Sequence, residues 1–388
     1  MLIRSLPLLA LLAAAPAAAR VIPSAEASPP TPVGMRVRVD SARSEMLIEV
    51  GPVDMAPDGE HHQLPAFHAR LPVSGWLRGY RVEMVDGNGR TLPSRMLHHV
   101  NLITPEQREL FSPIMLRVGA AGQETGPVML PRMLGYRFRR GQELIVTSML
   151  HNPTGRVQRG VWMRLRLPYT PADAVIRPMD VLPFYIDVMP PASLHAYDLP
   201  PGRSRRSWDA RPAIAARILA IGGHVHRYGT ALRLEDLTAR RVIWEGRPVL
   251  GRDGEIAAMP HARFLWKLGI PVRPGHLYRV TAEYDNNSGK TIPGGAMGTV
   301  GGVLVPDDAS RWPAVDRDSP ELKLDWHLVH TGNQGGHMHM HAEAAPAAGQ
   351  DHGRMPGMSQ GAAARPAARA DATAGATHAH AHDHPSHR

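Results

Sequence analysis

The chain has 388 residues, no cysteine, 22 histidines, 19 methionines and a formal net charge of +9. Without cysteine it has no disulfides, and a soft metal ligand can come only from methionine. No basic run is interleaved with aromatic residues, so we expect no nucleic-acid partner. The length is sufficient for two domains, each with a core of its own.

Residues 1–19, MLIRSLPLLALLAAAPAAA, have the pattern of an export signal. Arg4 supplies a positive start, an apolar run follows from Leu6 to Ala15, and small residues end the segment. The run is too short to span a bilayer, and no later stretch reaches the ~18 apolar residues that a membrane helix needs. We therefore expect a periplasmic or secreted protein with no integral membrane segment, in which residues 20–33 form a linker.

Two strand-rich blocks follow, residues 34–185 and 186–335. Segments such as MRVRVD and ELIVTSML in the first block, and LYRVTAEYDN in the second, alternate in hydrophobicity, and turn signals such as DGNG and NPTG separate them. The second block ends near LDWHLVH. The Pro-rich passage VMPPASLHAYDLPPG is expected to connect the blocks. Each block has the length of one β-sandwich, so the predicted fold class is all-β with two tandem sandwich domains.

Residues 336–388 change abruptly to Ala, Gly, Pro, His and Met. They contain almost no large apolar side chain, so we expect a disordered tail. Alternating His and Met, as in HMHMH at 337–341, offers weak and exchangeable copper sites. The tail is therefore expected to bind additional copper, and low-complexity drift is the alternative.

The segment IGGHVHRYG carries two histidines separated by one valine. In an extended strand His224 and His226 lie on one face, while Val225 faces the other side. This is the geometry of a metal clamp. The alternative is a pair of histidines that face solvent.

Three further patterns offer metal ligands. His98 and His99 are adjacent at what reads as a strand end, so they can share one metal only if a bend or bulge re-aims one of them. His151 ends a strand before an Asn-Pro turn, and Met297 lies among glycines that expose its thioether. Taken singly, each has an ordinary alternative as a surface histidine or a core methionine.

The order of these residues resembles a known family. An HH pair, a His about fifty residues on, HxH, and a Met after the YxNxS-like YDNNS are similar to the copper type II, ascorbate-dependent monooxygenases, which include peptidylglycine alpha-hydroxylating and dopamine beta-monooxygenases. The resemblance runs from Leu97 to about Val303. In addition, LPRMLGYRF before His151 looks like the family's Leu-Pro…Gly-aromatic-Arg segment.

The resemblance implies two jelly-roll-type sandwiches, each with one copper, that face each other across a solvent-filled cleft. It also implies dioxygen, ascorbate or another small reductant, and an unidentified small-molecule or peptide substrate whose activated C–H bond is hydroxylated. Imidazole suits both copper oxidation states and thioether favours Cu(I), whereas zinc rarely takes Met. Carried over by position, the electron-transfer set is His98, His99 and His151, and the catalytic, oxygen-activating set is His224, His226 and Met297.

The chain also departs from the family. It lacks the disulfides of the known enzymes, Val100 follows the HH pair where the animal enzymes have Met, and no residue matches their substrate contacts. A non-catalytic copper-binding or copper-handling protein on the same scaffold is the alternative, and a purely structural sandwich pair is a third reading. A rival HH pair lies in GEHHQLPAFHAR, with His61, His62 and His68. The remaining histidines are expected to face solvent or to be hydrogen-bonded: His195, His261, His276, His327 and His330.

Overall fold

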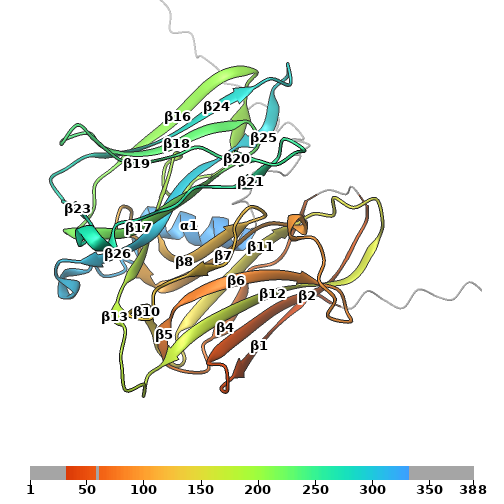
Figure 1. The fold of residues 1–388 in the computed structure, drawn as a ribbon, viewed down its shortest axis with the longest axis horizontal. Coiled ribbons are helices and arrows are strands. Elements are labelled where there is room, and N and C mark those ends of the chain that lie inside the picture. The colour runs from red at the N-terminus through yellow and green to blue at the C-terminus, as the bar shows by residue number, and fades with distance from the viewer. Residues whose placement is uncertain (1–31, 58–60, 332–388) are drawn as a thin grey trace, which may run out of the picture. The chain divides into compact units, whose positions relative to one another are not determined.

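The computed structural model describes residues 32–57 and 61–331. Strands dominate these residues, so the predicted all-β sandwich architecture is confirmed (Figure 1). The export-signal prediction and the His/Met-rich tail fall outside the described residues. Within the described ranges, no helix has the length and apolar character needed to cross a bilayer.

The first sandwich has two sheets that enclose one core. Ile48 and Leu165 of one sheet are fully buried in the same cluster as Leu102 and Val146 of the other, as alternation of apolar residues along each strand requires. The first sheet comprises β1 (Gly34–Asp40), β2 (Glu45–Met55), β5 (Gly75–Leu77), β6 (Gly79–Val85), β9 (Val128–Met129), β10 (Leu134–Phe138), β12 (Gln158–Pro171) and β13 (Met179–Asp180). The second comprises β3 (His62–Gln63), β4 (Phe67–Arg70), β7 (Leu97–Arg108), β8 (Met115–Gly122) and β11 (Glu143–Leu150), with the 3-10 turn η1 (Ser94–Met96) before β7.

The second sandwich is built in the same way. Ile218 and Val300 of one sheet share a buried cluster with Leu232 and Val280 of the other. One sheet comprises β14 (Leu182–Asp187), β17 (Ala216–Val225), β22 (Ala262–Arg263), β23 (Ile270–Val272) and β26 (Gly298–Pro306). The other comprises β16 (Gly202–Ala210), β18 (Gly229–Asp236), β19 (Arg241–Gly246) and β24 (Tyr278–Asn286). Two ribbons and two 3-10 turns complete it: β15 (Tyr197–Leu199) with β25 (Ile292–Ala296), β20 (Val249–Leu250) with β21 (Ile256–Ala258), η2 (Leu265–Lys267) and η3 (Ala309–Arg311).

The Pro-rich passage VMPPASLHAYDLPPG does not connect the sandwiches. β14 precedes it and pairs with β26, whereas β15 lies within it and pairs with β25. Strand pairing in the second sandwich therefore begins at Leu182, before the expected boundary at 186, and the passage is internal to that sandwich. Proline lacks a backbone N–H and is confined to loops and edge strands, so a run of prolines marks a loop inside a domain as readily as a linker.

The segment LDWHLVH, which was expected to close the second strand block, is part of helix α1 (Pro320–Thr331). Leu322 and Val329 lie on one face of this helix and pack against Ile103, Met115 and Ile145 of the first sandwich. The helix therefore returns the chain to the outer face of β7, β8 and β11, and Figure 1 shows it beside β7 and β8. The 3.6-residue periodicity of its buried positions is too short a signal to separate it from a strand in the sequence.

A buried ion pair holds α1 in place. Asp325 accepts hydrogen bonds from the Arg117 guanidinium at 2.8 and 2.5 Å and from the Met115 backbone N–H at 3.0 Å. The Arg117 and Asp325 side chains are only 5% and 1% exposed. Because a buried charge without its partner is strongly unfavourable, this pair requires α1 to stay docked on β8.

The two sandwiches meet along an edge where their cores interlock. Leu110 and Phe111 follow β7 but are buried in the core of the second sandwich, and the Phe111 ring centre lies 5.8 Å from that of Tyr278. Beside them, buried Glu109 accepts backbone N–H bonds from Arg117 at 2.7 Å and Tyr185 at 3.1 Å. Burial raises the pKa of Glu109 to about 8. These contacts join the sandwiches just after the last residue of β7, at the opposite end of that strand from the HH pair.

We predict that Asp325→Ala lowers the free energy of unfolding by about 3–5 kcal/mol, because Arg117 is left buried without an anion. Chemical denaturation measures the change. Asp318→Ala is the matched control, because the Asp318 side chain is 97% exposed and forms only a surface ion pair with Lys323. Equal effects of the two substitutions would show that the buried pair does not anchor α1.

Candidate metal centre

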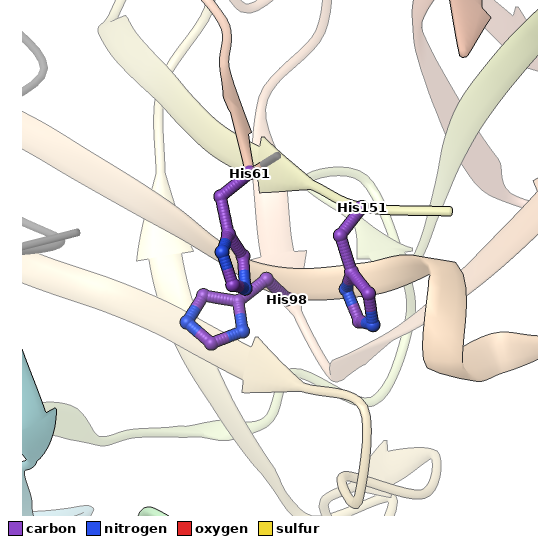
Figure 2. A group of neighbouring side chains, drawn as sticks. All are labelled: His61, His98 and His151. Carbon is purple, nitrogen blue, oxygen red and sulfur yellow. The ribbon is translucent and has the colours of Figure 1, made fainter. Parts of the chain in front are cut away.

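Three histidines converge in the first sandwich. The ligand nitrogens of His61, His98 and His151 all lie within 4.8 Å of one another. Figure 2 shows the three imidazoles reaching one place from three separate segments. His61 precedes β3, His98 lies at the start of β7, and His151 follows β11. Such a set of mutually close nitrogens matches a three-imidazole metal site.

Strand register brings this trio together. β3 runs antiparallel to β11 with His62 opposite Leu150, so the next residues outward, His61 and His151, are neighbours. β7 pairs with the other edge of β11, with Leu97 opposite Leu150 and His99 opposite Met149. His98 is therefore the extra residue of a β-bulge. We expected the HH pair to need a bend or bulge before both histidines could face one metal. The structure has such a bulge at His98.

Backbone and side-chain hydrogen bonds fasten the end of β11. The His151 N–H donates to the Met96 carbonyl at 3.0 Å, directly before β7. The fully buried Asn152 amide donates to the carbonyls of Met55 at 3.2 Å and Ala56 at 2.9 Å, at the end of β2. The chain runs from that point toward His61. The two residues that follow β11 are thus tied to the segments that carry the other two histidines.

The trio differs from the set that the resemblance implied. His61 takes the position expected for His99, whose ring centre is 4.5 Å from that of His98 but which is not a member of the close trio. The rival HH pair therefore supplies the third histidine of the trio. His61 directly precedes the two-residue strand β3, and a strand of that length is too short to show periodicity.

The second set lies at the end of β17. Val225 is 2% exposed and belongs to the core, so His224 and His226 share the opposite face, and their ring centres are 5.1 Å apart. Val225 pairs with Gly298 of β26, which places His226 opposite Met297 one residue beyond the pairing. The backbone of Met297 therefore lies beside that of His226, at the end of this strand pair.

Tyr284 of β24 holds the second set together. Its hydroxyl accepts hydrogen bonds from the backbone N–H groups of His226 at 3.1 Å and Met297 at 2.9 Å. The same hydroxyl donates to the Met297 carbonyl. One buried phenol thus fixes the backbone of both ligand segments, and burial raises its pKa far above the usual range.

Glu124, from the segment after β8, orients His224. Its carboxylate lies 2.6 Å from His224 Nδ1 and is 4% exposed. Burial lowers the pKa of His224, but the charge and hydrogen bond of Glu124 outweigh it and the net shift is upward. His224 Nε2 is buried and has no hydrogen-bond partner among the described residues. A carboxylate on one ring nitrogen and an unsatisfied second nitrogen form the arrangement that orients histidine ligands in metal sites. No spacing pattern in the sequence pointed to Glu124.

The electrostatics of the trio also suit a metal. Burial, followed by the charges of His61 and Arg95, lowers the pKa of His151 to about 4. Burial and the neighbouring His62 lower the pKa of His61. His151 Nδ1 is buried and has no hydrogen-bond partner in the described part of the chain. Neutral imidazole is the form that binds metal, so these two rings need not lose a proton first at neutral pH.

The two ligand sets adjoin. The ring centre of His98 lies 5.5 Å from that of His226. The resemblance implied metals that face each other across a solvent-filled cleft, whereas here imidazoles from the two sets are close neighbours. The Glu124–His224 bond joins the two sandwiches at this point, whereas the contacts around Glu109 join them at the other end of β7.

The remaining histidines divide into two groups. His195 Nδ1 lies 3.2 Å from the Tyr185 hydroxyl, and His276 Nδ1 lies 2.8 Å from Asp236, so these two are hydrogen-bonded as expected. His261 and His327 are exposed, as expected. His68, from the rival cluster, lies against His330, with their Nε2 atoms 2.9 Å apart.

The glycine pair before His224 generates a stability prediction. A Cβ at Gly223 would lie 2.2 Å from Leu232 Cδ2 and 2.7 Å from the Thr299 carbonyl oxygen, whereas a Cβ at Gly222 has its nearest contact at 3.6 Å. Gly223→Ala is therefore expected to destabilise the fold by about 1–3 kcal/mol, and Gly222→Ala, the matched control, by much less. Denaturant midpoints measure both variants. Equal midpoints would show that close packing at Gly223 is not required.

No family model and no curated protein matches this chain. Among solved structures, two of PNGF-II have TM-scores of 0.30 and 0.28 at 10% identity, over 70% of this chain. The match spans 61% of the length of PNGF-II. A structure of infectious bursal disease virus Gx strain has a TM-score of 0.20 at 11% identity, covering 75% of this chain and 77% of that one. A fucolectin from the serum of Morone saxatilis, the striped bass, has 0.15 at 10% identity, covering 70% and 85%. Likeness at these scores assigns no function, so function is argued from the site.

Proposed function

We propose that this chain is an exported copper protein with two adjoining metal sites, and that it hydroxylates an activated C–H bond with dioxygen and a small reductant such as ascorbate. The observation that carries the proposal is the convergence of three imidazoles from distant segments, beside His224 and His226, whose rings are close to each other and to His98. The proposed ligands are His61, His98 and His151 in one set, and His224, His226 and Met297 in the other.

The donor types favour copper. Three imidazoles suit both copper oxidation states, and a thioether beside two imidazoles selects Cu(I). Zinc rarely takes Met, and magnesium and calcium prefer oxygen donors. Copper would supply one-electron redox chemistry and dioxygen activation at these sites.

The chain's own residues would hold the donors in place. The Glu124 carboxylate accepts a hydrogen bond from the Nδ1–H of His224 and so directs Nε2 toward the metal position. Tyr284 keeps the Met297 backbone against that of His226, and the bulge in β7 keeps His98 beside His61 and His151. Ligands positioned before the metal arrives reduce the conformational entropy lost on binding.

A second candidate is a copper-handling protein that performs no hydroxylation. His61 is exposed, so one member of the first set is open to an exchanging partner. The sequence of the tail adds exchangeable His and Met donors. This candidate expects bound copper without substrate-coupled turnover.

We predict that His61→Ala lowers the copper affinity of the trio by at least about 10-fold, because it deletes one of the three imidazoles. The variant should therefore bind one core copper ion fewer per chain. Copper per chain and the Cu(II) electron paramagnetic resonance spectrum measure this loss. The tail is the same in the parent chain and the variant, so the difference between them reports the core site. His327→Ala, exposed on α1, is the control. His99→Ala should retain the metal. If instead His99→Ala loses copper and His61→Ala keeps it, the set implied by the resemblance is the correct one.

We predict that substrate-coupled oxygen consumption with ascorbate disappears in Met297→Ala and His226→Ala, because each deletes a ligand of the second set. Glu124→Gln should keep its copper but lower the rate by about 10–100-fold, since it weakens the orientation of His224. Met133→Ala is the control, because Met133 is 75% exposed and lies outside the site. Stoichiometric copper without turnover on any C–H substrate would favour the copper-handling candidate, and no bound copper would remove both.

A further inference from the structure

Two histidines outside the proposed copper sites face each other on the first sandwich. His68 lies on β4, and His330 lies in the last turn of α1. Their Nε2 atoms are 2.9 Å apart although the residues are 262 positions apart in the sequence. Docking of α1 through Asp325 brings them together.

The hydrogen bonds of the other ring nitrogens decide where the protons lie. His330 Nδ1 is 2.7 Å from the Trp326 carbonyl oxygen, which only accepts, so Nδ1 must carry a hydrogen. His68 Nδ1 is 2.6 Å from the Glu143 carboxylate, which likewise accepts. Each neutral ring therefore directs a bare Nε2 lone pair at the other. Two acceptors at this distance need a cation, either a shared proton or a metal ion, to be stable.

We propose that His68 and His330 form a bis-imidazole binding site for Cu(II). Metal–imidazole bonds are about 2.0–2.1 Å long, so two such bonds at a right angle place their nitrogens about 2.9 Å apart, whereas a tetrahedral angle places them about 3.3 Å apart. The observed separation of 2.9 Å lies at the short end of this range and the ring centres are 5.0 Å apart, so both Nε2 atoms can bind one ion after a small rotation of the rings. Tetragonal geometry with nitrogen donors is characteristic of Cu(II), and water would fill the remaining positions. The site shares no ligand with the two sets above and does not depend on the proposed function.

The surroundings support a cation at this point. Glu143 fixes the tautomer of His68 and supplies negative charge, part of which Arg70 offsets from 3.4 Å. His330 is in the last turn of α1, where the partial negative charge of the helix end favours a cation. The Trp326 ring stacks on His330 at 4.3 Å between ring centres and shields one side. The His68 side chain is 39% exposed, so metal can enter from solvent.

Histidine carbethoxylation, read peptide by peptide by mass spectrometry, tests the site in the full chain despite the histidines of the tail. With increasing Cu(II), His68 and His330 should become protected with one common half-saturation, and Zn(II) should require at least about 10-fold more metal. His330→Ala should abolish the protection of His68, and His68→Ala that of His330. Glu143→Gln should weaken protection about 10–100-fold, and His327→Ala, on the same helix, should leave it unchanged.

Either His68→Ala or His330→Ala could disturb α1. The rate of histidine carbethoxylation without metal reports such a disturbance, and the other variant then still tests the site. Cu(II) protection of His68 that is unchanged in His330→Ala, or no protection in the parent chain, would overturn the proposal. His98 and His151 are read in the same experiment. Their protection reports the proposed copper centre separately, so failure of one site does not decide the other.

Discussion

The bulge in β7 is the constraint on which the candidate centre depends. β7 carries one residue more than β11 between the pairs Leu97–Leu150 and His99–Met149, and that residue is His98. In a regular ladder His98 and His99 would point to opposite faces. The bulge, together with pairing of β3 on the other edge of β11, brings imidazoles from three segments within 4.8 Å. A local irregularity of the sheet thus determines which histidines meet.

A buried asparagine recurs where each sandwich positions its ligand segments. The side chain of Asn152 donates to the carbonyls of Met55, Ala56 and Arg156 and accepts from the Thr154 hydroxyl. The side chain of Asn286 makes the corresponding bonds in the second sandwich, to the carbonyls of Leu199, Pro200 and Lys290 and from the Ser288 hydroxyl. In the first sandwich this bond fixes the end of β11, where His151 lies. In the second it fixes β24 to β15, which pairs with the strand that ends one residue before Met297. A buried amide with all its hydrogen bonds satisfied is a rigid anchor for a turn.

Buried charged residues hold helix α1 and the junction between the two sandwiches. The Arg117–Asp325 pair, together with the apolar face of α1, docks this helix and so brings His330 to His68. Glu109 receives backbone N–H groups from both sandwiches and lies beside the interlocked cores. Because the chain has no cysteine, these polar anchors and apolar packing stabilise the fold without disulfides.

Local periodicity in the sequence determined the all-β class, the shared face of His224 and His226, and the inward direction of Val225, because alternation depends only on neighbouring residues. Only the tertiary structure decided that His61 joins His98 and His151, that Glu124 reaches His224, and that α1 returns to the first sandwich. These outcomes depend on strand register and on buried pairs between residues 100 and 208 positions apart. Local pattern carries no information on such pairings, since their free energy comes from contacts that form only when distant segments meet.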